Sequence, residues 1–135
     1  MNTIFKTYAA VILFAACSSG ASLEDCLFTV QKDGRESGSG FLLKDTNGIW
    51  MVSNDHVVKQ DGEIKFIGMT DESRVYTLPE TIEVAANRDA VRFKTEESDG
   101  FVLTDACSFD EKVFAFGNSG GLGVITKSEG KVVGK

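Results

Sequence analysis

The chain has 135 residues, of which 42% are hydrophobic and 25% charged, with a single proline, and this composition is typical of a globular protein rather than a disordered one. Twenty acidic residues against 14 basic ones give a formal net charge of −6, which argues against a basic surface that follows nucleic-acid phosphates, so we expect no nucleic-acid partner. A chain of this length normally forms one small domain.

Residues Met1–Ala21 have the three-part layout of an export signal. A short polar start containing Lys6 is followed by an apolar run over residues 8–16 and then by small residues. The run is shorter than the roughly 20 apolar residues that a membrane-spanning helix needs, so we expect cleavage. Removing these 21 residues from the 135 leaves 114, with a net charge of −7 because Lys6 is lost. The sequence predicts an exported protein that is periplasmic, secreted or an outer-membrane lipoprotein.

Two cleavage sites compete at the end of this leader. Phe14-Ala15-Ala16-Cys17 resembles a bacterial lipoprotein box, in which Cys17 would carry a lipid that anchors the protein to a membrane. Phe14 departs from the leucine usual in that box. Ser19-Gly20-Ala21 fits an ordinary signal-peptidase site with small residues at the required positions. Both sites stay open at this point.

Three cysteines are an odd number for an exported protein. Lipidation or removal takes Cys17 out of the core and leaves Cys26 and Cys107 as a candidate disulfide. This bridge would close a long loop and stabilise the fold by about 4 to 5 kcal/mol in the chain-entropy model. The alternative is two buried thiols.

Short runs of β-branched and aromatic residues recur after the leader at close spacing, and no amphipathic helical pattern of useful length intervenes. We therefore expect an all-β fold, either an antiparallel barrel or a sandwich. The expected strands are Cys26–Gln31, Gly40–Lys44, Gly48–Ser53, Glu63–Gly68, Arg74–Leu78, Thr81–Ala85, Ala90–Lys94, Lys112–Phe116, Gly123–Thr126 and Lys131–Val133.

The connections between these runs carry Asp, Asn and Gly, which tolerate positive φ. Examples are Lys32-Asp33-Gly34 and Gln60-Asp61-Gly62. Asn47-Gly48, between two hydrophobic runs, is the strongest hairpin signal. The polar stretch Glu96–Asp110 is predicted to be a linker to a second β unit that begins at Lys112.

His56 is the only histidine of the chain, and it follows the expected strand Gly48–Ser53. A lone histidine is usually structural, but its surroundings favour a catalytic role here. Gly38-Ser39-Gly40-Phe41 lies upstream, Asn54-Asp55-His56-Val57-Val58 contains the histidine, and Asp89-Ala90-Val91 opens an alternating strand downstream. These three motifs, in this order, resemble the trypsin-like serine peptidases, particularly the bacterial HtrA-type and glutamyl-endopeptidase-like branch.

The resemblance spans Gly38–Asn118 and implies that His56 is the general base and Asp89 its orienting carboxylate. Imidazole can accept a proton near neutral pH, and a carboxylate fixes its tautomer. Asp55 is the rival partner, but on a short turn its side chain is expected to point away from the ring. The structural alternative for Asp89 is a strand-start cap or an ion pair with Arg88 or Arg92.

Ser119 lies in Gly117-Asn118-Ser119-Gly120-Gly121, which looks like the nucleophile loop of this family. It follows Asp89 by only 30 residues, whereas the family's nucleophile comes after most of a second barrel. Lys112–Asn118 and Gly123–Thr126 resemble instead the first hairpin of that barrel, with Ser119 in the place of a turn proline. We therefore expect a chain cut short before its nucleophile. An inactive homologue and a catalytic Ser119 are the alternatives.

The resemblance implies a chymotrypsin-like double β-barrel, with a leader over 1–21, a complete N-terminal barrel over 22–98, and a linker and an only-begun C-terminal barrel over 99–135. The implied activity is that of a serine endopeptidase, which hydrolyses a polypeptide substrate by acyl transfer without a metal or cofactor. The 135-residue chain itself is expected to be inactive without the missing serine. The alternative is an exported β-barrel binding module in which His56 and Asp89 are idle.

Overall fold

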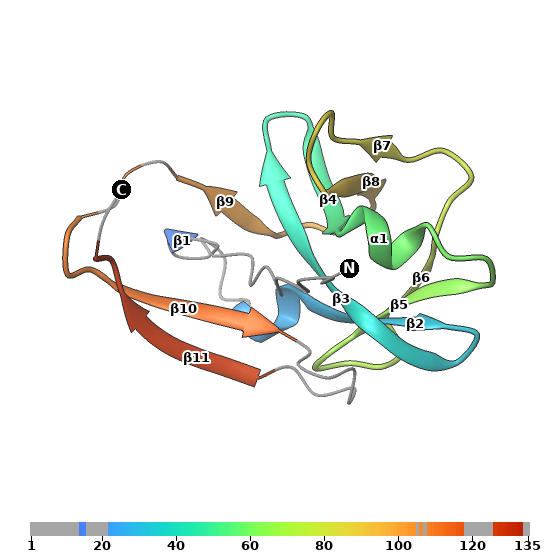
Figure 1. Ribbon diagram of the computed structural model, residues 1–135, viewed down its shortest axis with the longest axis horizontal. Helices are drawn as coiled ribbons and strands as arrows, with labels where there is room; N and C mark the ends of the chain where they lie inside the picture. Colours follow the sequence, from blue (N-terminus) through green and yellow to red (C-terminus); the bar gives the residue numbers. More distant parts are fainter. Residues whose placement is uncertain (1–13, 16–21, 105, 107, 118–125, 134–135) are drawn as a thin grey trace, which may run out of the picture.

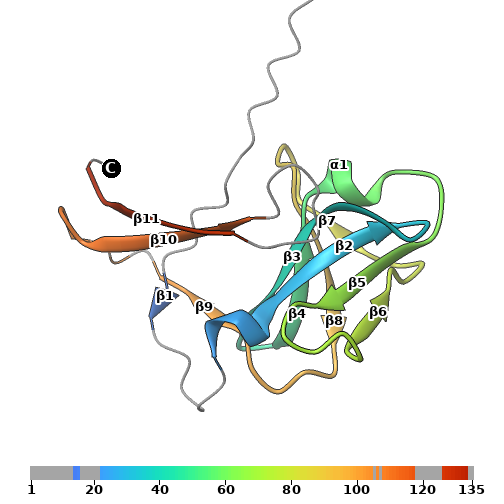
Figure 2. The ribbon, with the colours of Figure 1, turned by 90° about the horizontal axis from the view of Figure 1, so that it is seen from below.

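A computed structural model of the chain describes residues 14–15, 22–104, 106, 108–117 and 126–133. The fold is all-β, and its main sheet curls into a half-barrel (Figures 1 and 2). The elements are β1 (Phe14–Ala15), the 3-10 helix η1 (Leu23–Cys26), β2 (Leu27–Lys32), β3 (Arg35–Asp45), β4 (Gly48–Ser53), α1 (Asp55–Val58), β5 (Ile64–Gly68), β6 (Val75–Thr77), β7 (Glu83–Val84), β8 (Val91–Thr95), β9 (Phe101–Leu103), β10 (Lys112–Gly117) and β11 (Thr126–Lys131).

The main sheet has the spatial order β6-β5-β2-β3-β4-β8-β7, with antiparallel pairing between all of these neighbours. β9 lies off this path and pairs in parallel with β3, and the backbone of β1 pairs with β9. β10 and β11 form a separate two-stranded sheet (Figure 1). Among the described residues, no helix is long and apolar enough to cross a membrane.

Tight hairpins build the centre of the sheet, as the turn residues predict. Asp33 and Gly34 form the loop between β2 and β3 with φ of 49° and 78°, the mirror-image turn that matches the twist of paired strands. Gly48, the first residue of β4, has φ of 140° and pairs with Asp45 at the end of β3. The strand predicted over Gly48–Ser53 coincides with β4.

The structure differs from the sequence predictions in two segments. The polar stretch Glu96–Asp110 contains β9, whose Phe101 is only 1% exposed, because three apolar residues suffice to extend the curl beside β3. The strand expected at Lys131–Val133 is wrong, because β11 covers Thr126–Lys131 instead, and the strand expected at Gly123–Thr126 lies, apart from Thr126, outside the described residues. The polar residues of β11 stay extended because each pairs with a residue of β10.

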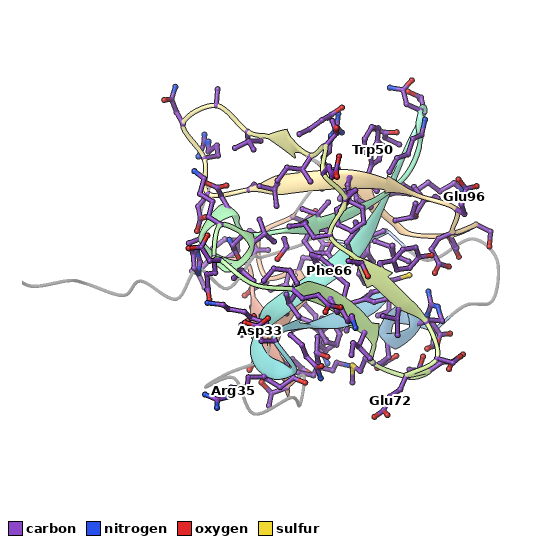
Figure 3. The ribbon with its side chains drawn as sticks, turned by 90° about the vertical axis from the view of Figure 1, so that its right-hand side faces the viewer. Asp33, Arg35, Trp50, Phe66, Glu72 and Glu96 are labelled. Carbon is purple, nitrogen blue, oxygen red and sulfur yellow. The ribbon has the colours of Figure 1, made fainter. Side chains whose placement is uncertain are left out.

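The core fills the inside of the curl with aromatic and aliphatic side chains that alternate along the strands. Phe66 and Phe93 meet edge to face with ring centroids 5.2 Å apart. Figure 3 shows Phe66 among the interior side chains, whereas Asp33, Arg35 and Glu72 lie at the periphery. The largest fully buried side chains are Phe28, Phe66, Phe101, Leu42, Met51, Val30 and Cys26.

Candidate catalytic pair

The segment that carries His56 is held against the end of the barrel by two residues of β3. The hydroxyl of Ser53, the last residue of β4, donates to the carbonyl of Ser39 at 2.8 Å. A Cβ atom at Gly38 would lie 2.8 and 2.9 Å from the methyl groups of Val57, which is closer than real Cβ contacts allow. Glycine at position 38 therefore lets α1 pack directly on β3. The predicted Gly-Ser-Gly motif thus positions the helix that presents His56.

Asp89 reaches the same helix because β8, which it precedes, pairs with β4, so that Ser53 and Val91 lie opposite each other. Its Oδ2 lies 2.5 Å from His56 Nδ1, and its Oδ1 accepts the backbone N–H of His56 at 2.9 Å. One carboxylate therefore holds both the ring and the backbone of the histidine. This contact through both carboxylate oxygens holds the His56 ring against Asp89, the partner expected from the sequence.

The charge of Asp89 is stabilised in this arrangement. Burial raises the pKa of Asp89, but hydrogen bonds from the backbone and ring of His56, the charge of His56 and the N–H of Asp55 together hold this pKa below its ordinary value. The carboxylate is therefore ionised at neutral pH and accepts a hydrogen bond from the N–H at Nδ1.

The other ring nitrogen of His56 is available for chemistry. The His56 side chain is 69% exposed, and no described residue forms a hydrogen bond with Nε2. When Nδ1 carries the proton, Nε2 carries the lone pair. The pair can therefore accept a proton from a hydroxyl that approaches from outside the described barrel.

The rival partners considered from the sequence are engaged elsewhere. The carboxylate of Asp55 pairs with Lys59 one helical turn later, not with the ring of His56. Arg92 pairs with Glu83 at 2.5 Å, and its guanidinium lies over the ring of Trp50. Arg92 is therefore not the partner of Asp89. Within the part of the chain that the structure describes, Arg88 forms no ion pair.

One contact of the site is absent from the sequence predictions. The side-chain amide of Asn54 donates from Nδ2 to the backbone carbonyl of Asp89 at 2.9 Å. Asparagine directly before a helix normally indicates a cap of that helix, so the sequence carries no signal for a contact 35 residues away.

Several predicted residues lie outside the described part of the chain, namely Cys17, Cys107 and Ser119. Cys26 is described and is 2% exposed at the end of η1. The disulfide, the lipid anchor and the role of Ser119 therefore stay predictions. Among the described residues, no group of three or more His, Cys, Asp or Glu is arranged to hold a metal ion.

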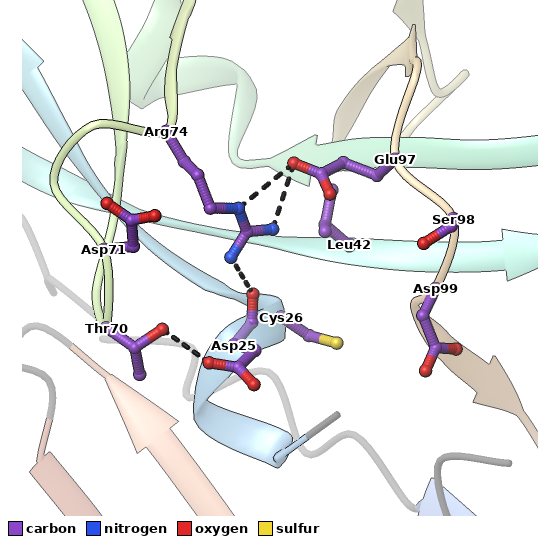
Figure 4. A pocket seen from close by; sticks show the side chains of 9 residues that line it. All are labelled: Asp25, Cys26, Leu42, Thr70, Asp71, Arg74, Glu97, Ser98 and Asp99. Carbon is purple, nitrogen blue, oxygen red and sulfur yellow. Dashed lines mark hydrogen bonds and ion pairs between the residues drawn. The ribbon is translucent and has the colours of Figure 1, made fainter. Parts of the chain in front are cut away.

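A hollow of about 290 Å³ lies beside η1, which Figure 2 shows at the opposite end of the half-barrel from α1. Hydrogen bonds and an ion pair join Arg74 to Glu97 and Asp25, as Figure 4 shows. Arg74 donates to the carbonyl of Asp25 at 2.7 Å and pairs with Glu97 at 3.0 Å, and the Thr70 hydroxyl donates to Asp25 at 2.5 Å. This hollow is a structural ion-pair network, and the candidate site is the pair at α1.

No protein-family model matches the chain, and no curated protein is significantly similar to it. The functional argument therefore rests on the curled β-sheet and on the contact between His56 and Asp89 at its end.

Proposed function

We propose that the chain belongs to a serine endopeptidase of the trypsin-like family, with His56 as general base and Asp89 as its orienting carboxylate. The observation that carries the proposal is the bidentate hold of Asp89 on His56, which leaves Nε2 without a partner among the described residues. In the reaction, Nε2 takes the proton of the nucleophilic hydroxyl as that oxygen attacks the scissile carbonyl. The resulting imidazolium, stabilised by Asp89, then gives this proton to the leaving amine.

The finer architecture is part of the same proposal. We infer that the half-barrel is the first barrel of a chymotrypsin-like double barrel and that β10 and β11 are the first hairpin of the second. The separate pairing of β10 with β11 supports this inference, as does the order of the motifs. The nucleophile then belongs to the second barrel, and Ser119 is a turn residue. The substrate is a polypeptide, met outside the cytoplasm after removal of the leader Met1–Ala21.

The first test is covalent labelling of the gene product isolated from its native cell. The product is treated with a fluorophosphonate, which reacts with activated serines, and its intact mass is measured before and after treatment. We expect one adduct on a product larger than this chain. An adduct on a product of the mass of this chain would instead make Ser119 the nucleophile. Absence of any adduct would contradict the peptidase proposal and favour a binding module with an idle His56–Asp89 pair.

Three variants of that product test the roles within the pair. His56→Ala should abolish both adduct formation and hydrolysis of a casein substrate. Asp89→Asn should slow hydrolysis by about 10⁴-fold, because the imidazole loses the carboxylate that fixes its tautomer. Asp55→Asn is the matched control, since this neighbouring carboxylate pairs with Lys59, and it should hydrolyse at the wild-type rate. Hydrolysis that survives His56→Ala would disprove the assignment.

A further inference from the structure

We infer that Asn54 is a positioning residue, which holds Asp89 in place against His56 through a hydrogen bond to the Asp89 carbonyl. The bond runs from Asn54 Nδ2 to Asp89 O at 2.9 Å. The inference deepens the proposed function and rests on it for the expected effect on hydrolysis. Its structural part, the placement of Asp89, does not depend on catalysis.

The backbone of Asn54 places its side chain where it could cap α1 instead of contacting Asp89. Asn54 is the N-cap residue of α1, with φ of −83° and ψ of 142°, and asparagine at this position normally accepts an N–H of its own helix. The Asn54 side chain forms no such bond. Asp89 supplies the missing acceptor, because its Oδ1 takes the N–H of His56. The two residues have exchanged roles: Asp89 caps the helix, and Asn54 holds Asp89.

The position of Asp89 explains why it needs this anchor. Residues 85–89, between β7 and β8, form an exposed turn in which Asn87 has a positive φ of 58°. A backbone hydrogen bond from Ala85 to Ala90 closes the turn. The Asn54 amide ties the Asp89 carbonyl to the start of α1, while His56 binds the carboxylate. Contacts at both ends of one residue fix its rotation as well as its location.

Two substitutions separate positioning from helix capping. Asn54→Ala removes the hydrogen bond to Asp89 and any side chain able to cap α1, whereas Asn54→Ser keeps a side-chain oxygen that can cap α1 but is too short to reach the Asp89 carbonyl. The readout is the proton on Nδ1 of His56, observed by NMR in the full chain labelled with ¹⁵N-histidine. Because His56 is the only histidine, its signal needs no further assignment.

We expect the wild type to show a slowly exchanging Nδ1 proton and both variants to lose or broaden it. In the active gene product, both variants should lower kcat by about 10-fold, the effect of one lost hydrogen bond, with KM unchanged. A wild-type signal in Asn54→Ser would overturn the inference, because Asp89 would then stay against His56 without the hydrogen bond to its carbonyl. A wild-type signal in Asn54→Ala would overturn it as well.

Separate control measurements distinguish a loss of folding from a loss of catalysis. The emission of the single tryptophan, Trp50, reports whether each variant is folded. If Asn54→Ala does not fold, Asn54→Ser, which keeps a helix cap, carries the comparison. If the wild type hydrolyses nothing, the proposed function fails, but the Nδ1 signal still decides whether Asn54 places Asp89.

Discussion

The phenol of Tyr76 donates a hydrogen bond to Glu97 at 2.8 Å, joining β6 at one edge of the main sheet to the segment after β8. Arg74 pairs with the same carboxylate at 3.0 Å, so these side chains close the seam of the curl. Burial, the hydrogen bond to Glu97 and the charge of Glu97 raise the pKa of Tyr76 to about 12.

This pKa predicts a loss of stability in alkali. The folded state holds the Tyr76 proton more tightly than the unfolded state, so the stabilisation is complete below the ordinary tyrosine pKa of about 10. It is lost as the pH rises from about 10 to 12, by no more than about 1 to 2 kcal/mol after allowance for solvent screening. Urea unfolding at several pH values should show this decline. Tyr76→Phe should decline less, and an equal decline would contradict the prediction.

Gly38→Ala should destabilise the barrel by about 1 to 3 kcal/mol, because the new methyl group would overlap the side chain of Val57. Thermal unfolding measures the change. The double variant Gly38→Ala/Val57→Ala should lose less stability than the two single variants lose in sum, since Val57→Ala makes room for the methyl group. Gly117→Ala is the matched control, because a Cβ there meets no atom within 4 Å. Additive losses would show that α1 does not rest on Gly38.

Arg92→Ala should shift the fluorescence emission of Trp50 to longer wavelength and lower the free energy of unfolding by about 0.5 to 1 kcal/mol. The Arg92 guanidinium lies 4.0 Å from the centre of the Trp50 ring and covers it from solvent. Lys94→Ala provides the control, because Lys94 Nζ lies 5.5 Å from the same ring. A shift as large in Lys94→Ala would mean that Arg92 is not the main cover of the ring.

Asp89→Asn should change how the free energy of unfolding depends on pH in the acidic range. The folded-state pKa of Asp89 is lowered, so its carboxylate contributes stability above the ordinary aspartate pKa of about 3.9. This contribution is lost as the pH falls through the lower folded-state value. Because Asp89 is 39% exposed, we expect a difference below about 1 kcal/mol between wild type and variant at pH 6. Denaturant unfolding should show the difference vanishing in acid, and a difference that persists unchanged there would contradict the prediction.

Local features of the sequence predicted much of the sheet correctly. Asp33-Gly34 and Gly48 specify their hairpins because few other residues adopt the positive φ that these turns need. Alternating apolar residues, such as those of β5, mark strands with one buried face. The contact between His56 and Asp89 was predicted from the motifs and is present, whereas their catalytic roles stay a proposal.

Other features depended on residues far apart in the chain. The polar strand β11 and the three-residue strand β9 exist because partners on β10 and β3 satisfy their backbone groups. The contact of Asn54 with Asp89 arises only where β4 and β8 pair.

The sequence by itself determined the turns, most strands and the pairing of His56 with Asp89, since these follow from backbone preferences and short motifs. Only the tertiary structure decided the closure of the sheet through Glu97 and the choice of Asn54 between its own helix and Asp89. The physical reason is that a side chain with two suitable partners, one local and one distant, follows the geometry that the whole sheet provides.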